Sequence, residues 1–363
     1  MSVRLCVGVA GLFALAWAGC NESVGQETGA APNKKPPTEI GNRIASLPNY
    51  ARFGFSGVAF DGGRLFVTTN IGLIEVQGTR VKSLHTWYAR DDVVEGPWVD
   101  QTGKDLWIQH AHDGALRRLD EAGWHFVALP PPPNGYYSRG DMLEGFRGAS
   151  DATGFRLIGG GQVWVWNQPE NWIRETSPSA PELSASVGVA FSRGREARVM
   201  RLGFCLVRPC DYAFYWRNGN GWSEGRNLPV ERLTHVLGTA DGVFARGDKG
   251  ELVRLDDDGA VLLETPGKCE AIARTSADRL MASFTGAGVF TLTPEGWTKA
   301  LDHPYGPSEG EHWAHLAERD GVVAYATTSM PTSNGKRESG ATALWVTEGG
   351  NWVRIDVEQA AKN

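Results

Sequence analysis

A short strand-like segment with a small residue near its centre recurs seven times along the chain. The segments are FSGVAF, VEGPWV, LEGFRG, SVGVAF, VLGTAD, CEAIAR and HWAHLA, with the small residues Gly57, Gly96, Gly145, Gly188, Gly238, Ala271 and Ala314. Successive small residues are 39, 49, 43, 50, 33 and 43 positions apart. Periods of this length are typical of repeat folds in which each repeat forms one small sheet.

A second mark follows the first in phase: a turn, a Trp and a short strand. It reads EAGWHFV, PENWIRE, GNGWSEG, PEGWTKA and GGNWVRI, while two units have QGTRVKSL and DDDGAVLL instead. Two further apolar segments lie between the marks, as RLFVTT and GLIEVQ do in the first unit. Four short strands joined by Gly, Asn and Asp turns are typical of antiparallel hairpins. The sequence therefore predicts an all-β, seven-bladed β-propeller over residues 50–363, with four antiparallel strands per blade.

Both marks have a structural explanation in such a fold. The innermost strands of a propeller crowd around the axis, which favours Gly or Ala there. A Trp in the outermost strand fills the widening wedge between neighbouring blades with about 150 to 250 Å² of apolar surface. The chain has 14 Trp and 46 Gly but a net charge of −6, which argues against nucleic acid as a partner.

The N-terminus has the pattern of an export signal. Residues 1–19 combine a positive start, an apolar core of about eleven residues and a small-residue end, too short for a membrane span. The end, AWAGC, resembles the lipobox of bacterial lipoproteins, with Ala18, Gly19 and Cys20 matching and Trp17 in place of the usual aliphatic residue. The resemblance implies that Cys20 carries the lipid. The alternative is an ordinary signal peptide that ends beside a Cys by chance.

Residues 20–49 are predicted to be a lipidated N-terminus and a flexible linker, because they are polar and rich in Gly, Pro and Ser. Such a tether has a root-mean-square reach of roughly 30 Å. Asn21 follows the Cys, and in the lipoprotein family this implies an outer-membrane lipoprotein of the cell envelope.

The hairpin-plus-Trp mark is similar to the Asp-box hairpin of sialidase-type propellers and to WD40-like repeats, most closely at VTEGGNW, residues 346 to 352. The Ser/Thr-x-Asp start of the Asp box is not kept across the units, so a sialidase relationship is not supported. The resemblance implies the propeller fold and selects no single family.

The cysteines fit an exported protein. Cys205 and Cys210 are close enough in sequence for a local disulfide, which leaves Cys269 free. The alternative is three reduced thiols packed as small apolar groups. No Cys-x-x-Cys or nearby His pair completes a zinc site, so no metal is expected.

Candidate binding residues gather in the loops of one face of the predicted ring. Glu95, Glu144 and Glu270 each precede a small inner-strand residue and are expected at equivalent heights, where they could bind a cation, pair with Arg or face water. His110, His112 and Asp113 could ligate a metal or be solvated. An aromatic platform for a sugar or peptide, or ordinary packing under loops, is predicted for Trp98, Tyr136, Tyr137, Arg139 and Trp313, with His312 beside it.

No common catalytic motif is present, and no cofactor is expected. The sequence favours a monomeric, membrane-anchored lipoprotein whose propeller is a non-enzymatic binding or scaffolding module for a protein or glycan. The alternative is a carbohydrate-active hydrolase or lyase with acid/base residues drawn from Glu95, Glu144, His110 and His312.

Overall fold

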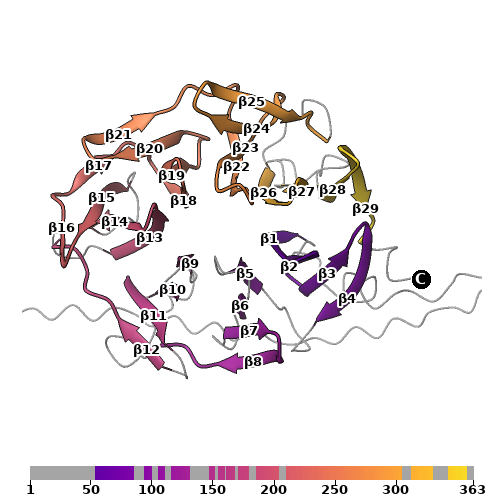
Figure 1. Ribbon diagram of the computed structural model, residues 1–363, viewed down its shortest axis with the longest axis horizontal. Helices are drawn as coiled ribbons and strands as arrows, with labels where there is room; N and C mark the ends of the chain where they lie inside the picture. Colours follow the sequence, from indigo (N-terminus) through magenta and orange to yellow (C-terminus); the bar gives the residue numbers. More distant parts are fainter. Residues whose placement is uncertain are drawn as a thin grey trace, which may run out of the picture. The chain divides into compact units, whose positions relative to one another are not determined.

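The computed structural model describes residues 54–85, 94–99, 105–110, 116–130, 147–151, 154–159, 161–167, 171–179, 185–203, 210–304, 312–329 and 342–357. These residues form seven separate antiparallel sheets arranged in a ring (Figure 1). The prediction of an all-β, seven-bladed β-propeller is therefore confirmed. We number the blades 1 to 7 in sequence order.

The strands of the first four blades follow one another along the chain. Blade 1 consists of β1 (Phe55–Asp61), β2 (Arg64–Thr69), β3 (Gly72–Gln77) and β4 (Arg80–His85). Blade 2 consists of β5 (Val94–Val99), β6 (Leu106–His110), β7 (Leu116–Asp120) and β8 (Gly123–Val127). Blade 3 consists of β9 (Arg147–Asp151), β10 (Gly154–Gly159), β11 (Gln162–Asn167) and β12 (Asn171–Arg174). Blade 4 consists of β13 (Ala185–Ser192), β14 (Arg195–Leu202), β15 (Asp211–Asn218), β16 (Gly221–Trp222) and β17 (Arg226–Leu228).

The last three blades each have four strands. Blade 5 consists of β18 (Leu233–Thr239), β19 (Gly242–Gly247), β20 (Leu252–Asp256) and β21 (Gly259–Leu262). Blade 6 consists of β22 (Cys269–Arg274), β23 (Leu280–Phe284), β24 (Gly288–Thr293) and β25 (Gly296–Leu301). Blade 7 consists of β26 (His312–Arg319), β27 (Val322–Ser329), β28 (Ala343–Glu348) and β29 (Asn351–Ile355). No helix among the described residues is long and apolar enough to cross a membrane.

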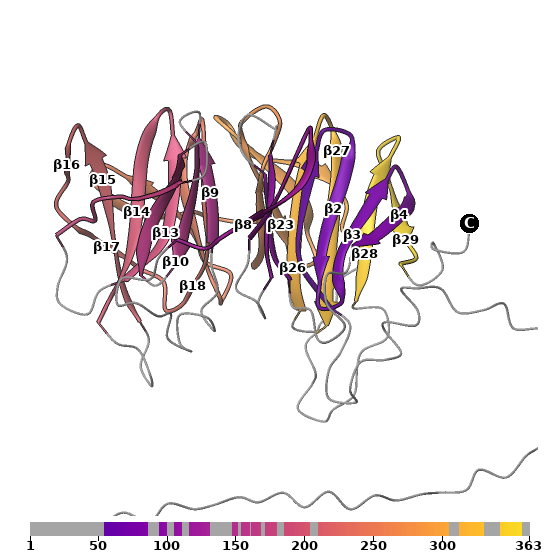
Figure 2. The same ribbon diagram turned by 90° about the horizontal axis from the view of Figure 1, so that it is seen from below.

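The first strand of each blade lies innermost, and these strands contact one another in a closed circle. In order, β1 contacts β5, β5 contacts β9, β9 contacts β13, β13 contacts β18, β18 contacts β22, β22 contacts β26, and β26 returns to β1. In side view the strands run from one face of the ring toward the other (Figure 2). Apolar clusters fill the spaces between blades.

The small-residue mark lies on innermost strands where it is described, and one Gly shows why bulk is excluded. A Cβ atom added at Gly238 in β18 would lie 1.9 Å from the backbone oxygen of Phe191 in β13. Because that neighbour is backbone, it could not move aside without disturbing blade 4. The third mark, Gly145, lies outside the described residues, and β9 begins at Arg147.

The Trp mark lies on the outermost strands and latches blades together. Trp172 in β12 donates its Nε1–H to the backbone oxygen of Ala128, just after β8, over 2.8 Å. Trp297 in β25 bonds to the oxygen of Glu264 after β21 at 2.9 Å, and Trp352 in β29 bonds to that of Asp302 after β25 at 2.7 Å. Each indole thus reaches the segment that leaves the preceding blade, which confirms its predicted place in the wedge.

Blade 4 departs from the predicted pattern at its edge. Trp222 ends the two-residue strand β16, and pairing with β15 resumes only at β17. Ser223 fills the interruption, since its backbone N–H donates to the oxygen of Trp216 at 2.7 Å and its hydroxyl accepts from the Trp216 N–H at 2.9 Å. The outermost strand of this blade is therefore broken but remains attached.

Buried ions join blade 4 to blade 3. Arg198 in β14 is fully buried and donates to Glu175, which follows β12, at 2.7 Å, and to the backbone oxygen of Thr176 at 3.0 Å. It also bonds to Glu196 on its own strand. Arg217 in β15 bonds to the second oxygen of Glu196 at 3.0 Å. Each of the two carboxylates therefore contacts more than one guanidinium, as buried ions require.

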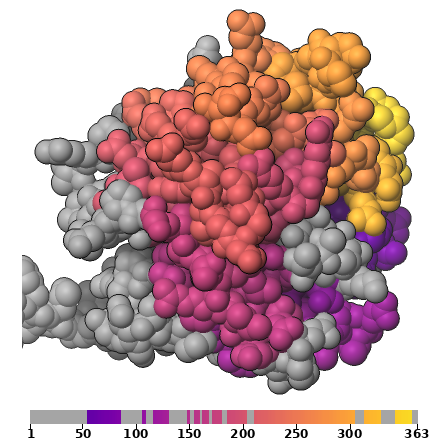
Figure 3. Space-filling model, turned by 60° about the vertical axis from the view of Figure 1, so that its left-hand side comes forward, coloured from indigo at the N-terminus to yellow at the C-terminus, as the bar shows by residue number. Residues whose placement is uncertain are grey.

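Blades 1 and 7 close the ring without exchanging a strand. Figure 3 shows the yellow last blade beside the purple first blade. One apolar cluster joins residues of both blades, including Leu65, Ile74 and Leu344. The Thr328 hydroxyl accepts from the Phe55 N–H at 2.7 Å and donates to the Phe55 oxygen at 3.2 Å.

Candidate binding site between blades 2 and 3

An aromatic group fills the space between blade 2 and blade 3. The Trp107 ring of β6 is fully buried and stacks on Phe155 of β10, with ring centroids 4.4 Å apart and planes 3° apart. Trp166 of β11 and Trp172 of β12 pack edge to face at 5.0 Å. Since β-strand side chains alternate in direction, the aromatic residues of four strands converge on this one interface.

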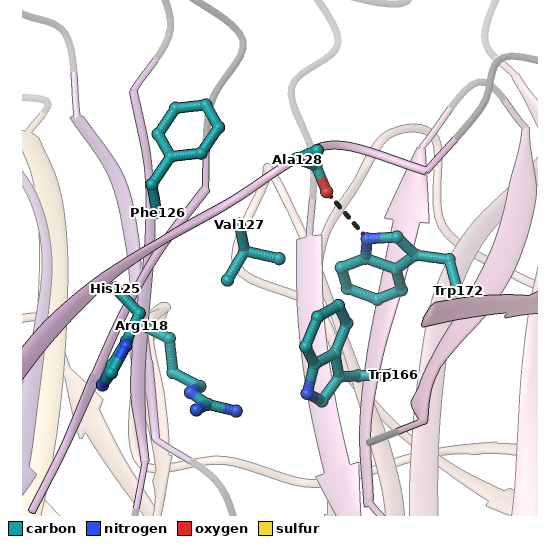
Figure 4. Close-up of a pocket in the computed structure, with 7 residues that line it drawn as sticks. All are labelled: Arg118, His125, Phe126, Val127, Ala128, Trp166 and Trp172. Carbon is teal, nitrogen blue, oxygen red and sulfur yellow. Dashed lines mark hydrogen bonds between the residues drawn. The ribbon is translucent and has the colours of Figure 1, made fainter. Parts of the chain in front are cut away.

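A cavity of about 130 Å³ opens beside these rings. Its lining comprises Arg118 of β7, His125 to Val127 of β8, Ala128, Trp166 and Trp172 (Figure 4). Val127 faces the two indoles, whereas the Phe126 ring lies at the rim and is 67% exposed. The guanidinium carbon of Arg117 lies 4.7 Å from the centre of the Phe126 ring. The site is therefore an aromatic hollow with an exposed aromatic edge.

An ionic group forms the polar side of the cavity. Arg118 Nη2 and His125 Nε2 lie 2.8 and 2.9 Å from the two oxygens of Asp120. Burial raises the pKa of Asp120, but hydrogen bonds from His125 and the Ala122 N–H, together with the Arg118 charge, outweigh this and lower it. The carboxylate is consequently ionised at neutral pH and holds the guanidinium and imidazole in place.

The size of the cavity restricts what it can hold. Small-molecule sites commonly enclose about 300 to 1,000 Å³, so this hollow has room for one sugar ring or one side chain of a larger ligand. Trp166 Nε1 is buried and, among the described residues, has no hydrogen-bond acceptor. A water molecule or a ligand oxygen in the cavity is the usual explanation for such a donor. The arrangement suits binding of a ring with both an apolar face and polar edges.

Of the three glutamates predicted to ring the axis, Glu270 is the one whose side chain is described. Its carboxylate is buried between blades 6 and 7, where Oε2 accepts from Tyr325 Oη at 2.7 Å and lies 3.0 Å from His303 Nε2. Thr285 donates to Oε1 at 3.0 Å. Glu270 therefore contributes to a buried polar cluster, and sequence reasoning missed its partners because they come from two blades.

The other predicted site residues are described only in part. Glu95 and Trp98 lie on β5, His110 ends β6 and His312 begins β26, but their side chains lie outside the described residues. Trp313 is 61% exposed on β26. Cys20, His112, Asp113, Tyr136, Tyr137, Arg139 and Glu144 lie wholly outside the description. Within the described chain, no cluster of three or more His, Cys, Asp or Glu side chains could hold a metal ion.

The cysteines differ in their surroundings. Cys269 is buried, and burial raises the pKa of its thiol to about 12, so it is an unreactive packing group. Cys210 is half-buried and forms no disulfide with a cysteine among the described residues. Its predicted partner Cys205 lies outside the described residues, in the connection between β14 and β15, and the disulfide stays a prediction.

The sequence pattern contained no signal for the cavity. It marked Trp172 as a wedge residue, but Arg118 and Trp166 belong to ordinary alternating strands. They face each other only because the twist of neighbouring blades brings β7 and β11 together.

Comparison with known proteins agrees with the fold and goes no further. No family model matches the chain, and no curated protein matches it in sequence. The β-propeller domain of Cps50 (Swd1) from Myceliophteria thermophila is 10% identical with a TM-score of 0.49, covering 83% of this chain and 100% of that one. The Dos1 propeller is 8% identical with a TM-score of 0.48, over 79% of this chain and 94% of that one. YCF48 bound to D1 peptide is 16% identical with a TM-score of 0.42, over 68% and 84%.

Proposed function

We propose that the protein is an exported lipoprotein whose propeller is a non-enzymatic binding module for a glycan near the membrane. The observation that carries the binding role is the aromatic and ionic cavity between blades 2 and 3. The N-terminal signal, Cys20 and the polar residues 20–49 support export and anchoring.

The chemistry of the cavity favours a sugar over other ligands. A pyranose ring has an apolar face that stacks on Trp or Phe and hydroxyl groups at its edge. The Phe126 ring and the Trp pair supply apolar contacts, while Arg118, held in place by the ionised Asp120, supplies N–H donors at a fixed position. A peptide side chain such as Tyr combines the same properties, and binding of peptides alone is the outcome that redirects the proposal to a protein ligand.

The binding role is tested by isothermal titration calorimetry of the full chain against oligosaccharides, cell-wall fragments and peptides. Phe126→Ala and Arg118→Gln are each expected to weaken binding about three- to tenfold, because each removes one contact. Matched controls are Leu262→Ala, an exposed apolar residue on the outermost strand of blade 5, and Arg195→Gln, half of an exposed ion pair. Saturable binding of a saccharide that neither Phe126→Ala nor Arg118→Gln weakens would reject this cavity as the site.

Anchoring is tested separately from binding. Metabolic labelling with a fatty-acid analogue is expected to mark the wild-type chain and not Cys20→Ser, because the Cys20 thiol is the only attachment point the lipobox offers. Equal labelling of both chains would reject lipidation at Cys20 and leave the binding role untouched.

A further inference from the structure

Two side chains at one end of the cavity between blades 2 and 3 present hydrogen-bond donors that lack acceptors. Figure 4 shows the Arg118 guanidinium and the indole nitrogen of Trp166 pointing toward one another, away from the Phe126 rim. Arg118 Nε and Trp166 Nε1 are both buried, and neither has a hydrogen-bond acceptor among the described residues. Buried donors are almost always satisfied, so this end of the cavity needs an acceptor from a ligand or from water.

The Arg118 guanidinium is held in place, and its charge is already balanced. Its Nη2 donates to Asp120 Oδ2 over 2.8 Å, and its central carbon lies 5.8 Å from the centre of the Trp107 ring. Arg118 Nε lies 4.0 Å from Asp105 Oδ2, which is too far for a hydrogen bond but close enough for the two charges to attract. The guanidinium therefore has two carboxylates beside it, while its Nε hydrogen still lacks an acceptor.

An apolar wall lies beside the two donors. Val127 is buried and faces the indoles of Trp166 and Trp172 (Figure 4). The Trp172 N–H is engaged by the backbone oxygen of Ala128, so Trp172 offers the cavity its apolar ring. A group that complements this end of the cavity has an acceptor oxygen next to a small apolar part.

We propose that this end of the cavity binds the acetamido group of an N-acetylated amino sugar, an inference that rests on the proposed glycan ligand. The carbonyl oxygen of such a group has two lone pairs and no hydrogen, so it accepts from Arg118 and Trp166 together. The methyl group packs on Val127 and the indole rings, where its burial is favourable. The sugar ring then lies toward the exposed Phe126 ring at the rim.

Other common sugar substituents complement the two donors less well. A hydroxyl oxygen accepts hydrogen bonds but has no apolar part to cover Val127. A carboxylate or a sulfate brings negative charge close to Asp120 and Asp105, which already balance Arg118, and like charges at such distances repel. The cavity is therefore expected to prefer an acetamido sugar both to its hydroxyl counterpart and to an acidic sugar.

A matched pair of oligosaccharides isolates the acetamido group. Chitotriose and cellotriose differ only in an acetamido group in place of one hydroxyl on each ring. In calorimetric titrations of the full chain, chitotriose is expected to bind at least about tenfold more tightly, because cellotriose leaves the buried donors unpaired. The methyl glycosides of N-acetylgalactosamine and galactose form a second pair with the other common ring configuration.

One substitution removes a donor and keeps its ring. Trp166→Phe is expected to weaken chitotriose about three- to tenfold more than cellotriose, because it deletes the N–H that only the acetamido oxygen engages. Trp164→Phe is the matched control. Trp164 is a buried indole of the same strand, β11, and its Nε1 also lacks an acceptor among the described residues, but it does not line the cavity. This variant is expected to keep the wild-type preference.

The wild-type protein gives a second measurement that needs no variant. In saturation-transfer difference NMR with the acetamido sugars, the acetamido methyl protons are expected to receive the largest saturation, because this group is enclosed and the ring lies at the rim. If Trp166→Phe does not unfold cooperatively, this measurement decides. Largest saturation on the ring protons would overturn the proposal.

The outcomes separate this inference from the proposed function. Equal affinity within both sugar pairs, or an undiminished preference for chitotriose in Trp166→Phe, rejects the acetamido site and leaves glycan binding by the cavity intact. Failure of every saccharide to bind rejects the glycan ligand itself, and the acetamido site with it.

Discussion

The interface between blades 3 and 4 and the interface between blades 7 and 1 each join neighbouring blades. The first uses buried ions, and the second uses apolar side chains. The first is built around the fully buried Arg198, which bonds to Glu175 and Glu196. The second is an apolar cluster that includes Leu65, Ile74 and Leu344, with Thr328 and His315 hydrogen-bonded to the backbone of Phe55 across it. Blades 3 and 4 are consecutive in sequence, whereas Thr328 and Phe55 are 273 residues apart.

The difference shows what each kind of contact supplies. Buried ions are directional, so they permit one alignment of neighbouring blades but contribute little net stability, because desolvation offsets their attraction. Apolar contacts stabilise in proportion to the area they bury and tolerate small displacements. The interface between blades 7 and 1, called the seam below, has to offset the loop-closure entropy of the long chain segment between them. It does so with apolar contacts.

The largest effect is expected from breaking the ionic interface on one side only. Arg198→Met keeps the length of the side chain but leaves Glu175 and Glu196 short of a buried partner, which costs about 3 to 5 kcal/mol of unfolding free energy. Denaturant unfolding measures it. Arg195→Met, which breaks an exposed pair with Asp257, is the control and is expected to cost less than about 1 kcal/mol. Equal losses in the two variants would contradict a structural role for the buried ions.

A smaller loss is expected at the seam. Leu344→Ala removes a fully buried side chain from the cluster of blades 1 and 7 and should cost about 3 kcal/mol. This loss should not change with salt concentration, because no charge is involved. Leu262→Ala, which truncates a 61% exposed residue, should leave the unfolding free energy nearly unchanged. A salt-dependent loss in Leu344→Ala would contradict an apolar interface between blades 7 and 1.

Acid is expected to weaken the seam. His315 bonds to the backbone of Phe55 across it, and its pKa is lowered from 6.5 to about 4, chiefly by burial. The unfolded chain therefore takes up a proton before the folded chain does. Stability is complete above pH 6.5 and falls as the pH approaches 4, by about 1 to 2 kcal/mol for this residue at pH 5. Hydrogen exchange should show faster opening of β1 and β27 at pH 5, and His315→Gln should remove that change.

The smallest effect is expected from losing one of the Trp indole hydrogen bonds that join neighbouring blades. Trp352→Phe keeps most of the apolar contact but removes the bond to the Asp302 oxygen, which should cost about 1 kcal/mol. Trp297→Phe, which loses the bond to Glu264, should behave alike. Thermal unfolding of the two variants compares latches at two ordinary interfaces. The outer strand of blade 1, Arg80–His85, contains no Trp. Within the described chain, no indole hydrogen bond of this kind therefore joins blade 1 to blade 7.

The fold could be predicted because the repeats carry it locally. In blade 1 the segments RLFVTT and GLIEVQ are β2 and β3 to the residue, and the Trp turns mark outer strands in five blades. What failed was the alignment of the fifth and seventh repeats. The register of β18 and β26 places His235 and His315 at the level that Gly57 and Gly188 occupy in blades 1 and 4. The sequence pattern instead aligns Gly238 and Ala314 with Gly57 and Gly188, because it follows residue size alone.

The candidate site was beyond prediction for a different reason. Arg118 and Trp166 lie 48 positions apart and meet only through the twist between two blades, which no pattern within one repeat records. Trp172 was identified as a wedge residue, yet its packing alone does not reveal a hollow. Glu270 was found by its place before Ala271, but its partners His303 and Tyr325 come from the following connection and blade.

The bond between Phe55 and Thr328 also sets a time scale for synthesis. At about 5 to 20 residues per second, roughly 14 to 55 seconds pass between the appearance of the two residues, which are 273 positions apart. During this interval the apolar face of β2 and β3 has no partner, because β27 and β28 have not yet been made. The first blade therefore exposes an apolar face that is prone to aggregation until the last blade is complete.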